Sequence, residues 1–315
     1  MAKKHFLLPS WLINKMPVLR KSVWLLEAAV VKSLIAMIGK MPPERAYGFA
    51  AALFSGLKPV LPFTRKIRRN LSIAFPHKNE PEIEKLTRAV CGNLGRAAVD
   101  LVLARRIWAE RDRRIEFVLR DGADMANYHD RPAVLVEGHI GAWQLGIFVA
   151  AQYELHVTSV YAPEQNPYLK DFVAGLRAAM PLTWISRDGC MRELSKELKN
   201  GRIVGLVSDT RIDEGVPVPF FGTTIAANTS AARLAVRHHC DLIPIHTERL
   251  DAARFRLTVY KPIRPADPDA PVSEQARQMT AELFRHFEAW IRQDPSQWIC
   301  FSQRWPREYH AAPGG

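Results

Sequence analysis

The feature of this sequence that most constrains its fold is the alternation of short apolar runs with helix-like segments from residue 115 to residue 292. Apolar and other residues alternate over positions 115–119, which is typical of a strand, and the unbroken apolar run at 133–136 is typical of a strand buried on both faces. Further strand-like runs occupy residues 157–161, 183–185, 203–207, 241–246 and 255–260.

Helical periodicity fills the intervals between these strands. We expect helices over residues 81–109, 143–151, 167–180, 191–200, 230–238 and 273–292. Residues 210–224 are rich in Pro, Gly and Phe, and we expect a loop there. Strands and helices that alternate at these lengths predict an α/β fold in which helices flank a mixed, largely parallel sheet.

The N-terminal part of the chain is typical of a membrane-associated region. Its apolar run at residues 23–38 is shorter than the about 20 residues of a spanning helix and contains Glu27 and Lys32. We therefore expect an interfacial helix there and a second apolar segment at 47–61. A basic cluster that anionic headgroups would hold follows: Arg65, Lys66, Arg68 and Arg69. The sequence thus predicts membrane-associated helices over 1–64 and a main domain over 65–310. Two amphipathic helices packed on the globular body are the alternative.

The charge of the chain indicates an anionic partner. Its 44 Lys and Arg residues exceed its 32 Asp and Glu residues, which gives a formal charge of +12. Nucleic acid, anionic lipid headgroups and an acidic carrier protein would each suit this charge. Because no helix-turn-helix, zinc-finger or RNP pattern occurs, and the basic cluster follows an apolar segment, we expect an anionic membrane surface and no nucleic acid.

The four cysteines are widely spaced and include no C-x-x-C pair. This spacing argues against a zinc site and against a disulfide framework. His139 also has no His or Cys at ligand spacing, so we expect no metal.

The strongest candidate for chemistry lies where the strand at 133–136 ends, in the segment EGHIGAWQ at residues 137–144. In open α/β folds, ligands bind at the carboxyl ends of the strands, and a His there can act as general base toward a hydroxyl. Gly138 and Gly141 allow the backbone and a substrate to approach closely. The N-terminus of the next helix would offer N–H groups to an oxyanion or phosphate. The alternative is that His139 only caps this helix.

Several segments of the chain together resemble one family. They are residues 69–76 (RNLSIAFP), 139–144 (HIGAWQ), 160–167 (VYAPEQNP), 185–189 (ISRDG), 208–222 (SDTRIDEGVPVPFFG) and 297–305 (QWICFSQRW). Over nearly its whole length the chain is similar to the late acyltransferases of lipid A biosynthesis. These form the lauroyl/myristoyl transferase family of the lysophospholipid acyltransferase superfamily.

The resemblance implies a glycerol-phosphate-acyltransferase-like fold and an acyltransferase domain over residues 65–310. It implies transfer of a fatty acyl chain from a thioester, usually on acyl carrier protein, to a hydroxyl of a lipid A precursor. The reaction would take place at the cytoplasmic face of the bacterial inner membrane, with His139 as general base and without a cofactor. A lysophospholipid, an amino-acid lipid or an aryl polyene lipid remains open as the acceptor.

Position 144 departs from the family pattern, because Gln144 stands where the family has Glu or Asp. An amide oxygen can accept the imidazole N–H, but it cannot stabilise an imidazolium by charge. Glu137, two residues before His139, or Asp209, at the end of a neighbouring strand, could supply a substitute carboxylate. An active enzyme is the interpretation we favour. A deliberately inactivated variant and a lipid-binding homologue without turnover are the alternatives.

Substrate binding should involve cations and aromatic residues near the same edge of the sheet. Arg187 follows the short strand at 183–185, and Arg233 lies on the helix at 230–238. Guanidinium groups at such places suit phosphate on a glycolipid or on a carrier's prosthetic group. We expect His139 and Gln144 to be catalytic and the substrate-binding residues to be Gly141, Arg187, Asp209, Phe221, Gly222 and Arg233.

Overall fold

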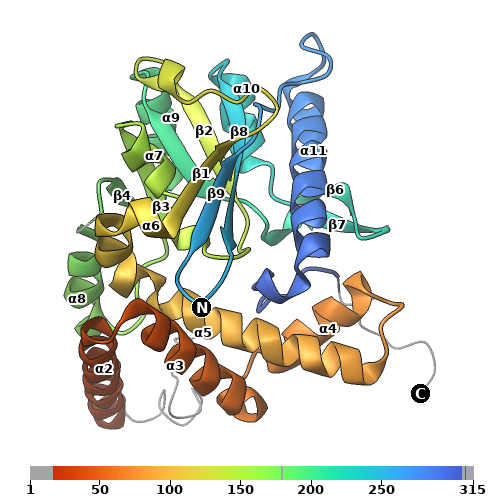
Figure 1. Cartoon of the computed structure of the whole chain (residues 1–315). Coiled ribbons are helices and arrows are strands. Elements are labelled where there is room, and N and C mark those ends of the chain that lie inside the picture. Colours follow the sequence, from red (N-terminus) through yellow and green to blue (C-terminus); the bar gives the residue numbers. More distant parts are fainter. Residues whose placement is uncertain (1–16, 179, 307–308, 310–315) are drawn as a thin grey trace.

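A seven-stranded sheet organises the part of the chain that this computed structural model describes, residues 17–178, 180–306 and 309. Its strand order is β1-β9-β8-β2-β5-β3-β4 (Figure 1). β8 and β9 pair antiparallel, and the other neighbours pair in parallel. The strands are β1 (Ile115–Leu119), β2 (Ala133–Glu137), β3 (Val157–Tyr161), β4 (Thr183–Ser186), β5 (Ile203–Val207), β8 (Asp241–Arg249) and β9 (Phe255–Val259). The predicted α/β class with a mixed, largely parallel sheet is confirmed.

Helices cover both faces of the sheet and cross one of its ends (Figure 1). The α-helices are α2 (Pro17–Lys40), α3 (Pro43–Leu57), α4 (Thr64–Ala74), α5 (Glu80–Ala109), α6 (Arg111–Arg114), α7 (Phe148–Gln152), α8 (Pro167–Ala178), α9 (Cys190–Lys199), α10 (Ser230–Arg237) and α11 (Val272–Gln293). The short 3-10 helices are η1 (Lys58–Val60), η2 (Ala126–Tyr128), η3 (Trp143–Leu145) and η4 (Pro295–Gln297). The 30-residue α5 runs across the bottom of Figure 1, below the sheet.

Alternate side chains of the central strands supply two hydrophobic clusters, one on each face of the sheet. Val134 and Val136 of β2 belong to the cluster that includes buried residues of α9, α10 and α11. Ala133 and Leu135 belong to the cluster that includes buried residues of α3 and α7. Because α5 contributes residues to both clusters, it closes the end of the sheet instead of covering one face.

The apolar helix α2 lies against α8 and α5, at the lower left of Figure 1. By length and composition, a 21-residue segment of it could cross a membrane, although 28% of its apolar window is buried in the protein. Its buried Glu27 accepts a hydrogen bond from Asn166 Nδ2 (3.5 Å), which also donates to the carbonyl of Trp24 (2.9 Å). The charge of Glu27 therefore faces the protein, whereas Lys32, Leu26 and Val30 are exposed.

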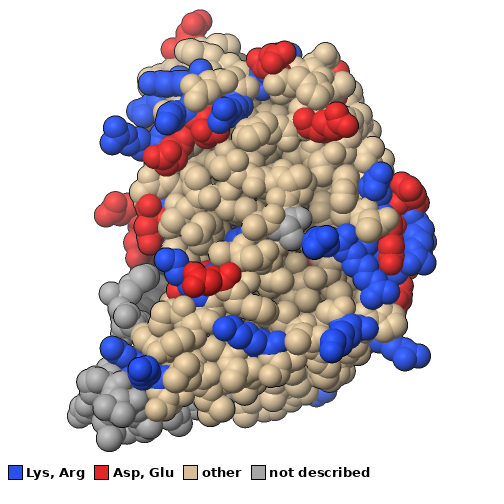
Figure 2. Space-filling model, turned by 90° about the vertical axis from the view of Figure 1, so that its left-hand side faces the viewer, with Lys and Arg blue, Asp and Glu red and all other residues tan. Residues whose placement is uncertain are grey.

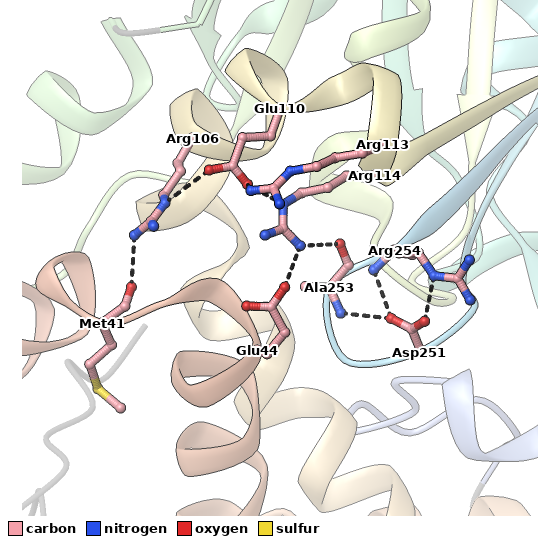
Figure 3. Close-up of polar contacts among 9 residues, drawn as sticks. All are labelled: Met41, Glu44, Arg106, Glu110, Arg113, Arg114, Asp251, Ala253 and Arg254. Atoms are coloured by element: carbon pink, nitrogen blue, oxygen red, sulfur yellow. Dashed lines mark hydrogen bonds and ion pairs between the residues drawn. The ribbon is translucent and has the colours of Figure 1, made fainter.

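A polar network fastens α3 to the end of α5 and to the turn between β8 and β9 (Figure 3). The buried Arg114 donates from Nη1 to Glu44 Oε1 (2.7 Å) and to the carbonyl of Ala253 (3.2 Å). Its Nε contacts Glu110 at the end of α5. Since burying an unpaired charge is costly, this pairing fixes how α3 sits on the sheet. The domain boundary near residue 64 stays a prediction.

The Pro- and Gly-rich stretch at 210–224 is not a loop, so that expectation was wrong. It forms a separate antiparallel hairpin of β6 (Arg211–Phe220) and β7 (Thr223–Ala227). Phe221 and Gly222 make the turn with φ values of 51° and 70°, as a two-residue hairpin turn of the mirror-image type requires. The prolines that indicated a loop are tolerated because β6 is an edge strand.

We predict opposite effects of Gly95→Ala and Gly48→Ala on the free energy of unfolding. A Cβ at Gly95 of α5 would lie 2.3 Å from the carbonyl oxygen of Ala50 in α3, so the helices must separate, at a cost of about 1–3 kcal/mol. A Cβ at Gly48, which is also helical, would meet nothing within 4 Å. Because alanine lowers the backbone entropy of the unfolded chain, Gly48→Ala should stabilise the fold by about 0.5–1 kcal/mol. Denaturant unfolding in one detergent checks both variants, and equal effects would contradict the close packing of α3 on α5.

Candidate active site

His139 lies two residues beyond the end of β2, at the carboxyl edge of the sheet. A segment from the far end of the sequence holds it there. The carbonyl of His139 accepts the N–H of Ile299 (2.8 Å), and the N–H of Gly141 donates to the carbonyl of Gln297 (2.9 Å). The backbone on both sides of His139 is thus tied to residues 297–299.

The expected continuous helix after His139 is absent from the described structure, and that expectation was wrong. The chain forms the 3-10 helix η3 and then the five-residue α7. The N–H groups of Gly141 and Ala142 bind the carbonyls of Gln297 and Thr247, so they do not point toward a ligand. Gly141 has a φ of 62°, and a Cβ on it would lie 2.0 Å from the carbonyl oxygen of Thr247. This position therefore requires glycine for close backbone packing.

A carboxylate from the neighbouring strand pairs with the imidazole of His139. Asp209 lies two residues beyond β5, which pairs with β2, and its Oδ1 is 2.6 Å from His139 Nδ1. Arg304 donates from Nη2 to Asp209 Oδ2 (2.7 Å) and from Nη1 to the Asp209 carbonyl (2.8 Å). The side chains of Asp209 and Arg304 are 3% and 2% exposed, whereas His139 is 20% exposed. Only the imidazole in this line of three groups is open to a substrate.

The charge on Asp209 fixes which nitrogen of His139 carries a proton. Burial alone would raise the pKa of Asp209, but Arg304 and His139 lower it to about 2. Asp209 is then ionised at neutral pH and can only accept, so Nδ1 of His139 carries the proton and donates. Among the described residues, no hydrogen bond occupies Nε2. This nitrogen is therefore available to take a proton.

Asn70 of α4 anchors the segment that carries Arg304. Its Nδ2 donates to the carbonyls of Cys300 and Ser302 (2.8 Å each), and its Oδ1 accepts the N–H of Arg304 (3.3 Å). Asn70 is fully buried, so these bonds are shielded from water. Two of the sequence segments that carried the resemblance, 69–76 and 297–305, are thus in direct contact behind His139.

Asn70 and Arg304 are the site residues to which sequence reasoning gave no role. A signal for them was present in the sequence, because Asn70 lies in the segment 69–76 and Arg304 in the segment 297–305, both of which carry the resemblance to the family. Across the part of the chain that the structure describes, no group of three or more His, Cys, Asp or Glu residues could hold a metal ion.

Gln144 lies on η3 and is directed to α5. Its Nε2 donates to the carbonyl of Ala97 (2.9 Å). The structure records Asp209, and not Gln144, as the hydrogen-bond partner of the His139 ring. Gln144 and its neighbour Trp143 line a cavity of about 340 Å³ between β2, β5, β3 and the segment after His139. The ring of Trp143 is 5.1 Å from that of His139, so one wall residue of the cavity also contacts the catalytic candidate.

Glu137, the last residue of β2, also lines this cavity. Its Oε1 accepts a hydrogen bond from the hydroxyl of Thr247 (2.9 Å). Burial raises the pKa of Glu137 to about 8, and the bond from Thr247 offsets this only in part. Among the described residues, the carboxyl group of Glu137 makes no hydrogen bond to His139. The raised pKa favours the neutral form of this carboxyl group, which is partly buried on the cavity wall.

The four remaining expected substrate residues lie elsewhere. Arg187 is exposed after β4, and Arg233 is exposed on α10. Phe221 stacks on Trp298 in an aromatic cluster (5.8 Å between ring centroids), and Gly222 completes the hairpin turn. Within the described chain, no hydrogen bond, ion pair or ring contact joins any of these four to His139.

A sequence model of the family described as bacterial lipid A biosynthesis acyltransferase matches residues 15–307, which is nearly the whole chain. No curated protein matches the chain.

We predict that Glu137 makes the stability of the fold depend on pH. The pKa of this group rises from 4.5 to about 8 on folding, so between these values the folded state holds a proton that the unfolded state has released. Relative to Glu137→Gln, the free energy of unfolding of the native chain should fall from pH 4.5 to pH 8, by at most about 1.4 kcal/mol per pH unit. Urea unfolding at several pH values measures this difference, and a flat profile would argue against a neutral, buried carboxyl group.

Proposed function

This chain belongs to the bacterial lipid A biosynthesis acyltransferase family, and we propose that His139 is the general base of its acyl transfer. The reaction moves a fatty acyl group from the thioester of acyl carrier protein to a hydroxyl of a membrane lipid, with a lipid A precursor as acceptor. The observation that carries the proposal is the line Arg304–Asp209–His139, whose first two members are buried and which leaves Nε2 of the imidazole without a hydrogen bond among the described residues. The ring of Trp143, which lines the cavity, contacts the imidazole.

The proposed steps follow from the charges. Nε2 of His139 takes the proton of the acceptor hydroxyl while its oxygen attacks the thioester carbonyl. The imidazolium that forms is stabilised by the ionised Asp209. When the carbon–sulfur bond breaks, the imidazolium returns the proton to the leaving thiolate, so that the products are an ester and the free thiol of the carrier. The acyl chain occupies the cavity lined by Trp143 and Gln144 during transfer.

Asp209 supplies, in this proposal, the negative charge that position 144 lacks. The lipid-binding alternative without turnover rested on Gln144. A carboxylate at 2.6 Å from Nδ1 removes the reason to prefer that alternative, because orientation and charge both come from Asp209. Arg304 acts as a positioning residue, since it binds two oxygens of Asp209 and touches neither substrate.

We further propose that α2, α3 and η1 dock the protein on the anionic inner face of the bacterial inner membrane. Large apolar side chains are exposed on these elements: Leu25, Leu26, Val30, Met37, Phe49, Leu57 and Val60. Figure 2 views the side of the molecule that carries α2 and shows a broad uncharged surface with Lys and Arg below it and mixed Lys, Arg, Asp and Glu along its upper and right edges. The buried position of Glu27 favours a helix that lies in the interface, because a spanning α2 would have to part from Asn166. Basic residues beside apolar ones suit anionic headgroups.

We predict that the turnover number falls about 10²- to 10⁴-fold in His139→Ala and in Asp209→Asn. Gln144→Ala should lose about tenfold or less, because its amide bonds α5 and not the imidazole. Transfer of labelled acyl groups from acyl carrier protein to a lipid A precursor, with a panel of lysolipids in parallel, measures all three variants.

Unfolding curves control for damage to the fold, since Asp209→Asn leaves the buried Arg304 without its counter-charge. Arg304→Lys keeps the charge and should recover part of the activity lost in Arg304→Ala. If Gln144→Ala were inactive and Asp209→Asn fully active, the assignment of Asp209 as the residue that orients His139 would be wrong. An inert native chain that Gln144→Glu revives would identify a disabled acyltransferase.

We predict that Val60→Asp weakens binding to anionic vesicles about tenfold, because it removes an exposed apolar contact and adds repulsion. Val60 is 74% exposed. Val272→Asp is the matched control, since Val272 is also an exposed valine (51%) but begins α11, away from the proposed membrane face. Vesicle flotation of the two variants measures the effect, and similar binding of both would rule out a contact at η1.

A further inference from the structure

The side chain of Gln297 joins the end of β8 to the segment that holds His139. Its Oε1 accepts the backbone N–H of Arg249 (2.9 Å), and its Nε2 donates to the carbonyl of Arg249 (3.1 Å) and to Asp294 Oδ2 (2.9 Å). The amide thus bonds both backbone groups of one residue, as a residue of an adjacent antiparallel strand would. Because binding at two points leaves little freedom, Gln297 is fixed relative to β8.

The backbone of the same segment supports the main chain around His139. The carbonyl of Gln297 accepts the N–H of Gly141 (2.9 Å) and the Nδ2 of the buried Asn93 in α5 (3.2 Å). Two residues later, the N–H of Ile299 donates to the carbonyl of His139 (2.8 Å). The main chain is therefore held at and after His139 by a segment whose own position depends on the Gln297 amide.

A buried ion pair anchors this end of β8. Arg249 Nη2 donates to both carboxylate oxygens of Asp100 in α5 (2.8 and 3.0 Å), and both side chains are buried. The guanidinium carbon of Arg249 also lies 4.6 Å from the ring centroid of Tyr47 in α3 and 5.0 Å from that of Phe255 in β9. Neither charge can move away without leaving the other buried and unpaired. The backbone that Gln297 binds is thus a firm support, tied to α3, α5 and β9.

We propose that Gln297 is a second positioning residue of the reaction: its amide fixes where the His139 backbone lies, as Arg304 fixes, through Asp209, the direction of the imidazole. The inference rests on the proposed function, because it concerns the same proton transfer. Within the described residues, no hydrogen bond or ring contact joins Gln297 to the imidazole. Gln297 acts through the main chain alone.

The bond between His139 and Asp209 makes the site sensitive to small movements of this backbone. The distance of 2.6 Å between Nδ1 and Oδ1 is short even for a charged pair, so a displaced backbone would lengthen it. Nε2 would move by a similar amount relative to the acceptor hydroxyl. Since a misplacement of about 1 Å can cost about 10²-fold in rate, a side chain that touches no reacting atom can control turnover.

The first measurement is the kinetics of Gln297→Met, which removes the three hydrogen bonds of the amide but keeps the length of the side chain. Its turnover number should fall about 10- to 100-fold. The KM values for donor and acceptor should stay within about threefold, because no group that contacts a substrate has changed. Gln293→Met is the matched control, since the exposed Gln293 also bonds a residue of β8 (Nε2 to Glu248 Oε1, 3.0 Å) but not the turn after His139. It should keep the native rate.

The same substitution in a His139→Ala background separates positioning from general support of the fold. With no imidazole left to misplace, Gln297→Met should cause no further loss of the residual rate. A variant that only destabilised the fold would lower the rate by the same factor in both backgrounds. An equal loss in both backgrounds would therefore overturn the inference.

Nuclear magnetic resonance of chains with isotope-labelled histidine gives a readout that needs no turnover. The proton between His139 Nδ1 and Asp209 Oδ1 should resonate far downfield, because the bond is short and one partner is charged. Gln297→Met should move this signal upfield, and Gln293→Met should leave it in place. A turnover number that falls while the signal stays in place would also overturn the inference.

The two readouts distinguish this inference from the proposed function. If Gln297→Met moves the signal but His139→Ala transfers acyl groups at the native rate, Gln297 positions the imidazole and the general-base proposal is wrong. If His139→Ala is inactive but Gln297→Met keeps both the native signal and the native rate, the proposed function stands and Gln297 has no positioning role.

Discussion

The buried ion pair between Arg304 and Asp209 is the contact on which the rest of the site depends. Two charges at 2–3% exposure are stable only as a pair, because either alone would be left in an apolar interior. Their mutual attraction keeps Asp209 ionised, and the ionised group in turn fixes the orientation and the tautomer of His139. The orientation of the proposed general base therefore depends on a buried arginine that does not itself contact the imidazole.

The same arrangement explains why segments far apart in the sequence each carry a motif of the family. Asn70 of α4 holds the backbone of residues 300–304, and residues 297–299 hold the backbone around His139. α4 follows directly on the proposed membrane-docking helices. The imidazole is thereby connected, through hydrogen bonds, to the helix that follows the proposed membrane-docking elements.

Much of the fold could be predicted from the sequence, because the strands and helices of the α/β domain have clear periodicity. The hairpin β6–β7 and the break after His139 could not, since each depends on contacts that are distant in the sequence: Gly141 and Ala142 bind the carbonyls of Gln297 and Thr247. In the site, the positions of His139 and Asp209 after the ends of two strands correctly predicted that both lie at the carboxyl edge of the sheet. The direction in which the Gln144 side chain points, and the partner of Asp209, depend on three-dimensional packing that spacing along the chain does not encode.

The position of Arg304 has a consequence for biosynthesis. Every strand of the sheet precedes it in the sequence, so a ribosome has already made the whole scaffold before it adds the residue that charges Asp209. Domains fold progressively as they emerge, and the proposed membrane-docking helices precede the sheet in the sequence. Until translation has passed residue 304, Asp209 has no counter-charge, and the tautomer of the His139 imidazole is not fixed. Premature termination or clipping before this point would remove Arg304 together with the buried Trp305, and it would leave Asp209 without its counter-charge.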